Sequence, residues 1–136
     1  MHINDDENLG RMLKDARVIA VVGHSDKPFR TSYQIAQYLR NAGYTVYPVN
    51  PLVSEINGEK SYASLADVPE DIDIVDVFRR SEHLQGVVDE AAKVGAKAVW
   101  AQLGVYDDVS AKTAEQEGLE IVMDRCIKID HRRLII

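Results

Sequence analysis

The feature that most constrains the fold is an unbroken apolar run, VIAVV at residues 18–22, which ends at Gly23. A half-exposed strand alternates apolar and polar residues, whereas a strand covered on both faces is apolar throughout, as in parallel sheets. Residues 31–42 then carry apolar side chains at helical spacing, and Gly43 stands where a helix commonly ends. The run therefore predicts a buried strand that a helix connects to a parallel neighbour.

Strand and helix patterns continue to alternate along the rest of the chain. Further strands are expected at residues 44–49, 72–78, 98–103 and 119–123. Helices are expected to begin near Thr31, where Thr31-Ser32-Tyr33-Gln34 fits a capping box, at Ser81, and at Asp107 or Asp108. Between them, Asn57-Gly58 predicts a hairpin turn and residues 64–67 predict one helical turn.

This alternation predicts an α/β fold of the Rossmann-like class, with one parallel sheet of five strands in the order 3-2-1-4-5 flanked by helices. The strand at 72–78 is expected near the sheet edge, because Asp73 and Asp76 interrupt its apolar pattern. We assign residues 1–136 to a single domain, with a short N-terminal helix at 5–16, a core at 17–126 and a C-terminal tail at 127–136. The tail is basic and mixed in polarity, which predicts a last helical turn.

Charge and composition argue against several classes of protein. The net charge is −6, whereas nonspecific nucleic-acid binding depends on a basic surface. No apolar run reaches the length of about 20 residues that a membrane span needs, and the acidic N-terminus lacks the features of a signal peptide. Cys126 is the single cysteine, so no internal disulfide can form. We expect a cytoplasmic protein that binds neither nucleic acid nor membranes, and the sequence indicates no particular protein partner.

Positive side chains gather where the ends of the predicted strands meet. In an open parallel sheet, ligands bind beyond the carboxyl ends of the strands, where the strand order reverses. The loops expected there carry four cations in an otherwise acidic chain: Lys27, Arg30, Arg79 and Arg80. A helix that begins at Thr31 adds free N–H groups, which favour phosphate. These positions predict an anion site, in which Arg79 is favoured for phosphate and Arg80 for solvent.

Familiar nucleotide-binding motifs are missing from these loops. Residues 23–30, GHSDKPFR, contain one glycine and do not form the G-x-G-x-x-G motif of NAD-binding loops. The second strand ends at Asn50-Pro51 rather than at the acid that holds the NAD ribose. The chain also lacks the G-x-x-x-x-G-K-[ST] loop of nucleotide hydrolases. These departures count against NAD, and none of them weakens the case for phosphate.

Five segments together resemble one protein family: VVGHS at residues 21–25, PVNP at 48–51, VDVFR at 75–79, WAQLG at 100–104 and VMDRC at 122–126. In their order and spacing the chain is similar, from about residue 16 to residue 134, to the small single-domain CoA-binding proteins. That family in turn resembles the CoA-binding domain of succinyl-CoA synthetase and of ADP-forming acyl-CoA synthetases. The resemblance implies that the small-molecule partner is coenzyme A or an acyl-CoA.

The resemblance also implies roles for residues of these segments. It implies that the phosphates are contacted by Gly23, Ser25 and Arg30, and that the adenosine end is bordered by Asn50 and Pro51. The rest of the groove would be lined by Phe78, Arg79 and Gly104. With the positional argument added, the predicted cofactor-binding residues are Gly23, His24, Ser25, Lys27, Arg30, Thr31, Asn50, Pro51, Phe78, Arg79, Gln102 and Gly104.

Several of these residues have plainer roles that the sequence leaves open. Gly23 is either a tight turn or a point of close approach to the cofactor. Gln102 either caps a backbone group or touches the cofactor, and His24 is more often a solvated loop residue than a base. Trp100 is expected in the core. Cys126 is expected to be a small buried apolar residue, the alternative being a thiol that forms a mixed disulfide with CoA.

No catalytic constellation or metal site is predicted. The four histidines are scattered without metal-ligand spacing, and no G-x-S-x-G elbow is present. We therefore expect non-catalytic binding of coenzyme A or an acyl-CoA. Two alternatives remain open: an NAD(P)-binding enzyme or redox sensor, and an interaction protein with a vestigial nucleotide site.

Overall fold

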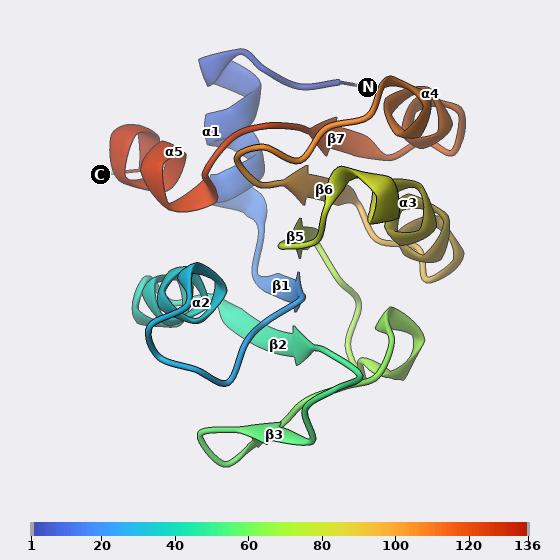
Figure 1. The fold of residues 1–136 in the computed structure, drawn as a ribbon. Helices are drawn as coiled ribbons and strands as arrows, with labels where there is room; N and C mark the ends of the chain where they lie inside the picture. Colours follow the sequence, from blue (N-terminus) through green and yellow to red (C-terminus); the bar gives the residue numbers. More distant parts are fainter. Residues whose placement is uncertain (1, 136) are drawn as a thin grey trace.

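The computed structural model describes residues 2–135, which form one parallel sheet between two layers of helices (Figure 1). The expected class, an α/β Rossmann-like fold with five parallel strands, is confirmed. Across the sheet the strands follow the order β2 (Thr45–Val49), β1 (Val18–Val22), β5 (Ile74–Val77), β6 (Ala98–Ala101) and β7 (Glu120–Val122). All five side chains of β1 are buried, as its unbroken apolar run predicts.

Strand β5 lies elsewhere than expected. The sheet is doubly wound, as expected: the strand order reverses beside β1, and the last two strands, β6 and β7, lie together on the side of β1 away from β2. However, β5 does not lie beyond β2 near the edge; it pairs with both β1 and β6, and all four of its side chains are buried. Asp73 precedes the strand, and its carboxylate accepts hydrogen bonds from the backbone N–H groups of Arg17 and Val18. Asp73 thus holds the start of β1 and Asp76 is buried within the sheet, so neither aspartate marks an edge strand.

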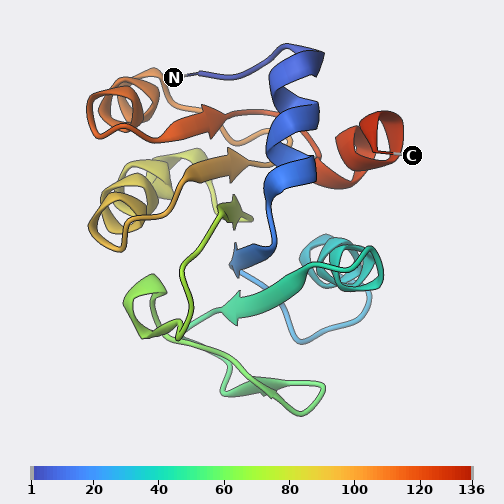
Figure 2. The same ribbon diagram turned by 180° about the vertical axis from the view of Figure 1, so that it is seen from behind.

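Two helical layers enclose two separate apolar cores, one on each face of the sheet (Figures 1 and 2). One face is covered by α1 (Asp6–Asp15), α2 (Thr31–Asn41) and α5 (Ile127–Leu134), and the other by α3 (Leu84–Lys93) and α4 (Asp108–Gln116). Trp100 belongs to the first core, fully buried as expected, and its Nε1–H donates to the carbonyl oxygen of Arg125. Within residues 2–135, no helix is long and apolar enough to cross a membrane.

The helix starts show which caps form. Asp107 caps α4 by accepting a hydrogen bond from the N–H of Ser110, as predicted. Helix α2 begins at Thr31 as predicted, but its N-cap is Arg30 and no side chain caps it, so the expected capping box is wrong. The first turn of α2 therefore keeps backbone N–H groups that no side chain satisfies.

The segment after β2 protects the sheet edge. As predicted, Asn57-Gly58 forms the turn of a hairpin, with φ of 52° and 83°, between β3 (Glu55–Ile56) and β4 (Glu59–Lys60). Beyond the hairpin, Tyr62 exchanges backbone hydrogen bonds with Pro48 and Asn50 and so extends the sheet past β2. The predicted helical turn follows as a 3-10 turn, Leu65–Asp67. The hairpin and β2 thus frame one side of the sheet's carboxyl edge.

The C-terminal tail is more ordered than its sequence predicts. Residues 127–134 form the helix α5 rather than a single turn. Asp130, almost fully buried, accepts hydrogen bonds from the guanidinium groups of Arg125 and Arg133, and Arg133 also pairs with Asp6 of α1. These ion pairs connect segments that are far apart in the sequence, so the local pattern could not reveal them.

Candidate functional site

The reversal of strand order lies between β1 and β5. Strand β1 is followed by α2 on one face of the sheet, and β5 is followed by α3 on the other face (Figure 1). The two connections diverge, which leaves a crevice beyond the carboxyl ends of the two strands. The crevice is bounded by residues 23–30 and by Phe78 and Arg79. Residues 23–30 are here called the phosphate loop, after the ligand that the sequence predicts for them.

Gly23 brings the two loops into close contact. Its φ is 87°, and a β-carbon at this position would lie 2.6 Å from the carbonyl oxygen of Phe78 and 3.4 Å from Cδ of Arg79. Its N–H donates to the carbonyl oxygen of Val49. A residue without a side chain is therefore needed for the fold itself, and it also brings the phosphate loop beside the Arg79 side chain.

Two pockets meet at this crevice. The α2-side pocket, of about 600 Å³, is lined by the phosphate loop and the first turn of α2, and the α3-side pocket, of about 700 Å³, by the end of β2, α3 and Arg79. Four residues line both pockets: Gly23, Asn50, Leu52 and Phe78. The two pockets therefore adjoin along these four residues, and together they are called the groove.

The α2-side pocket suits an anion. The N–H of Ser25 donates to Oγ of Ser32 at 3.0 Å, and Oγ of Ser25 accepts from the N–H of Lys27 at 3.0 Å, which fixes the curvature of the loop. Lys27 and Arg30 line this pocket beside the uncapped start of α2. Within residues 2–135, no ion pair involves Lys27, Arg30 or Arg79. Arg30 lies over the ring of Phe29, 5.6 Å from its centroid. None of the three charges is neutralised by a carboxylate of the described residues, so all three can meet the charge of a ligand.

The α3-side pocket combines apolar and polar side chains. Val22, Val49, Pro51, Leu65 and Val87 form much of its wall, together with Arg79, His83 and Glu90. Oε1 of Glu90 accepts a hydrogen bond of 2.6 Å from the N–H of Leu65, which holds the 3-10 turn against α3. An elongated ligand could place an anionic part in the α2-side pocket and an uncharged part against the mixed wall of the α3-side pocket.

Most of the predicted site residues meet in this groove. Those that line it are Gly23, Ser25, Lys27, Arg30, Thr31, Asn50, Pro51, Phe78 and Arg79. Asn50 also joins the loops, since its Nδ2 donates to the carbonyl oxygen of His24 and its Oδ1 accepts from the N–H of Leu52. Arg80 is exposed and lines neither pocket.

His24 is not in the groove. The expectation of a solvated loop residue is wrong, because its side chain is 0% exposed. Its ring contacts the backbone oxygen of Ser25 and the guanidinium of Arg40. Burial, together with the positive charge of Arg40, lowers the pKa of His24 to about 4. The imidazole is therefore neutral at physiological pH, and it lines neither pocket of the groove.

Gln102 and Gly104 also lie outside both pockets. Oε1 of Gln102 accepts a hydrogen bond from the buried N–H of Ile127, so the alternative of a backbone cap is confirmed. The N–H of Gly104 donates to Asp124, and its carbonyl oxygen accepts from Oγ of Ser81. Ser81 was expected to cap a helix; instead its hydroxyl holds the loop after β6, and a 3-10 turn (Ser81–His83) precedes α3. Gln102, Gly104 and Ser81 therefore make hydrogen bonds that hold loops and the start of α5.

The sequence reasoning missed one residue of the groove and one buried acid of the sheet. Leu52 is 92% exposed and lines both pockets; its position directly after Asn50-Pro51, at the carboxyl edge, was an available signal. Asp76 lies on β5 two residues before Phe78, between Val21 and Trp100 in register. Its carboxyl group is buried, and neither oxygen has a hydrogen-bond partner within residues 2–135. Burial raises the pKa of Asp76 well above its usual value, which favours the neutral acid.

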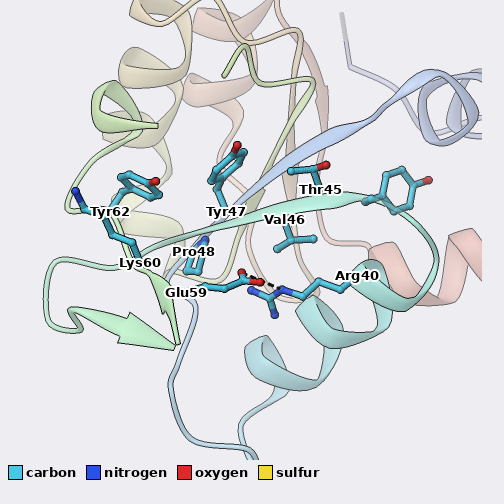
Figure 3. Close-up of a pocket in the computed structure, with 9 residues that line it drawn as sticks. Arg40, Thr45, Val46, Tyr47, Pro48, Glu59, Lys60 and Tyr62 are labelled. Carbon is cyan, nitrogen blue, oxygen red and sulfur yellow. Dashed lines mark ion pairs between the residues drawn. The ribbon is translucent and has the colours of Figure 1, made fainter. Parts of the chain in front are cut away.

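A further pocket, of about 510 Å³, lies outside the crevice, along β2 and the hairpin (Figure 3). Its charged groups already have partners: Arg40 pairs with Glu59 at 3.8 Å, and Lys60 lies over the ring of Tyr62. The hydroxyl of Tyr47 donates to Glu70. This pocket therefore offers fewer free polar groups than the groove. Residues 2–135 hold no group of three His, Cys, Asp or Glu side chains able to bind a metal.

Comparison with known proteins agrees with this geometry. Residues 17–132 match the model of the CoA binding domain family. The chain is 42% identical over 120 residues to the uncharacterized protein YneT of Bacillus subtilis, covering 88% of this chain and 89% of that protein. It superposes with a TM-score of 0.94 on a hypothetical protein from Pyrococcus horikoshii, at 40% identity, covering 98% of this chain and 94% of that one.

Larger proteins contain a related region. The ADP-forming acetate–CoA ligase of Methanocaldococcus jannaschii is 28% identical over 119 residues, which are 82% of this chain and 17% of the ligase. The similarity thus spans a small part of the ligase and most of this chain. Because the family model matches the strands, the phosphate loop and α2 together, the chain belongs to the CoA-binding domain family.

Proposed function

We propose that this protein binds coenzyme A or an acyl-CoA in the groove without catalysing a reaction on it. The observation that carries the proposal is the set of cations without a carboxylate partner in the described part of the chain, Lys27, Arg30 and Arg79, around two adjoining pockets at the reversal of strand order. Coenzyme A carries a diphosphate and a 3′-phosphate on one side and an uncharged pantetheine arm, with two amides, on the other. The cations beside the start of α2 suit the phosphates, and the mixed apolar and polar wall of the α3-side pocket suits the uncharged arm.

Each part of the cofactor has candidate partners in the groove. The phosphates would meet the phosphate loop and the start of α2 through Ser25, Lys27, Arg30 and Thr31. The adenosine would lie beside Asn50 and Pro51 at the end of β2, and Phe78 and Arg79 would line the remaining path. Leu52, which lines both pockets, joins this set as an apolar contact. His24, Gln102 and Gly104 are left out, since their contacts are made within the protein.

Binding without chemistry is favoured by the groups around the α2-side pocket, where the phosphates would lie; His83 and Glu90 line only the α3-side pocket. A general base needs a free ring nitrogen within reach of the ligand. Both ring nitrogens of His24 are engaged with protein groups, and the ring is buried. The other polar groups of the α2-side pocket are cations, hydroxyls and amides, with the carboxylate of Asp26 as the exception. Such groups hold phosphates and have no evident nucleophilic role.

Isothermal titration calorimetry of the purified chain tests the proposal. CoA and acetyl-CoA are expected to bind with similar affinity, because the phosphates supply most of the contacts, and both should raise the melting temperature. NADH and NADPH are the matched comparison ligands, since they share the adenosine diphosphate. Tight binding of NADH without binding of CoA would overturn the assignment and favour a dinucleotide enzyme. Turnover of an acyl-CoA, followed by release of free thiol, would overturn its non-catalytic part.

A further inference from the structure

The side chain of His24 lies where the phosphate loop, α2 and the hairpin come together. The ring is fully buried and stands edge-on to the ring of Tyr33, with centroids 6.0 Å apart and an interplanar angle of 87°. Its Nδ1 is 2.8 Å from the carbonyl oxygen of Ser25, and its Nε2 is 3.2 Å from Nη2 of Arg40. Tyr33 and Arg40 both belong to α2.

These contacts fix one tautomer of the imidazole. A guanidinium can only donate hydrogen bonds, so Nε2 must be the acceptor from Arg40. Nδ1 then carries the proton and donates it to the carbonyl oxygen of Ser25. The ring therefore links a helix residue to the backbone of the phosphate loop through two directed hydrogen bonds.

The hairpin reaches the same two helix residues. Glu59 pairs with Nε of Arg40 at 3.8 Å, and Nδ2 of Asn57 donates to the hydroxyl of Tyr33 at 2.6 Å. Figure 3 shows the first of these links, with the Arg40 side chain extending from α2 toward Glu59 on the hairpin. Both hairpin contacts thus end on side chains that touch His24.

At its other end the chain of contacts reaches the groove. The carbonyl oxygen of Ser25 accepts from His24, its N–H donates to Ser32, and its hydroxyl accepts from the N–H of Lys27. Ser25 is therefore held through three groups. Its conformation determines the course of the loop that carries Lys27 and Arg30 into the α2-side pocket.

We infer that His24 is a positioning residue, which couples the hairpin to the phosphate loop and thereby sets the affinity of the groove for its phosphate ligand. This inference rests on the proposed function for the identity of the ligand, but the coupling itself exists without ligand. On the hairpin, Glu59 contacts Arg40 and Asn57 contacts Tyr33. Arg40 and Tyr33 in turn contact the ring of His24, which donates to the carbonyl oxygen of Ser25. A partner or modification that displaced the hairpin would loosen the phosphate loop.

The ion pair between Glu59 and Arg40 can be removed without unfolding the protein, so the inference can be tested separately from folding. The side chain of Glu59 is 58% exposed, and exposed ion pairs contribute little to the stability of a fold. Glu59→Gln should therefore fold normally, and its carboxamide lies outside the groove. Glu120→Gln is the matched control, because Glu120 pairs with Arg11 at the opposite end of the sheet.

The first experiment needs no ligand. Amide chemical shifts and hydrogen exchange are measured by NMR for wild type, Glu59→Gln and Glu120→Gln. We expect faster exchange and shifted resonances at Ser25 and Lys27 in Glu59→Gln and unchanged values in Glu120→Gln. Identical spectra of the phosphate loop in all three proteins would overturn the coupling, whatever the ligand is.

The second experiment measures the Kd for CoA. Glu59→Gln should weaken binding a few-fold. His24→Phe keeps a ring against Tyr33 but loses both hydrogen bonds, and it should weaken binding about tenfold, the order of magnitude of one hydrogen bond, because the loss reaches the ligand only through Ser25. His24→Asn retains an N–H that can reach the carbonyl oxygen of Ser25, and it should recover much of the loss. Unchanged affinity in both His24→Phe and Glu59→Gln would overturn the inference. If the wild-type protein binds no CoA, the proposed function fails, and the ligand-free spectra still decide the coupling.

Discussion

The carbonyl oxygen of Phe78 stands only 2.6 Å from the point that a β-carbon of Gly23 would occupy. The backbone after β1 and the backbone after β5 are thus packed as closely as a glycine allows. This contact closes the floor of the groove and explains why the phosphate loop and Arg79 lie side by side.

Gly23→Ala is expected to destabilise the protein. Its φ of 87° alone costs a residue with a side chain about 1–3 kcal/mol, and the clash with a backbone oxygen adds to this. Gly10→Ala is the control, and it is expected to stabilise the protein. A methyl group there meets nothing within 4 Å, and alanine in a helix is more stable than glycine by about 0.5–1 kcal/mol. Urea unfolding measures both. Equal stability of the two variants would mean that the Gly23 backbone relaxes freely.

Asp76→Asn is expected to change how stability depends on pH. The raised pKa means that the folded state retains a proton that the unfolded state loses near pH 3.8, so this group costs stability as the pH rises above that value. Asn cannot ionise and removes this cost. The stability of Asp76→Asn relative to wild type should therefore increase between about pH 4 and about pH 7, by at least about 1 kcal/mol, the value of one pKa unit.

Measuring the difference between variant and wild type isolates Asp76 from the other acids. Asp73 and Asp130 have lowered pKa values, because backbone N–H groups and arginines hold their charged forms, and they contribute in the opposite direction in both proteins. Chemical unfolding at several pH values provides the comparison. If the free energies of unfolding of the two proteins changed in parallel with pH, the pKa of Asp76 would be the same in the folded and unfolded states, and the expectation would be wrong.

Arg30→Ala and Arg79→Ala should each weaken CoA binding by about 1–3 kcal/mol, the usual worth of hydrogen bonds to charged groups. Neither should change stability much, because neither arginine takes part in an ion pair within residues 2–135. Arg80→Ala, exposed and outside both pockets, is the control. Calorimetry with CoA and dephospho-CoA assigns the phosphates: a variant that binds both equally has lost the partner of the 3′-phosphate. Wild-type affinity for CoA in both arginine variants would mean that backbone N–H groups, and not these arginines, bind the phosphates.

Gln102→Met should reduce stability and leave CoA affinity unchanged. Methionine fills a similar volume but offers no oxygen to the buried N–H of Ile127, and an unsatisfied buried donor costs about 1–3 kcal/mol. Thermal unfolding and CoA titration are made on the same preparation. A loss of affinity without a loss of stability would return Gln102 to the cofactor site.

Cys126→Ala should cost on the order of 1 kcal/mol. The side chain is half-buried at the start of α5 and packs against the core beneath α1, α2 and α5. Incubation with CoA disulfide followed by intact mass measurement is the second readout. We expect no adduct, since the residue lines neither pocket of the groove; a reducible increase of one CoA mass would instead support a redox role.

Local patterns in the sequence were sufficient for the elements and for the place of the groove. The unbroken run of β1 requires a strand covered on both faces, and the Asn57-Gly58 turn requires backbone with positive φ. Strands joined by helices bring their carboxyl ends to one edge, so the cations after β1 and β5 had to meet there. These conclusions depend on periodicity and chain connectivity, which the sequence contains in full.

Only the tertiary structure decided what depends on long-range packing. Strand β5 takes the centre of the sheet because both its faces are covered, although Asp73 and Asp76 gave it the pattern of an edge strand. His24 turns inward because Arg40 and the Ser25 carbonyl satisfy its ring, and those partners lie together only after α2 has packed on the sheet. The same holds for α5, whose Asp130 is paired with Arg125 and Arg133 and, through Arg133, linked to α1. A sequence pattern predicts that a polar residue is exposed, because the partners that allow it to be buried lie far away along the chain. Only the folded structure brings those partners next to it.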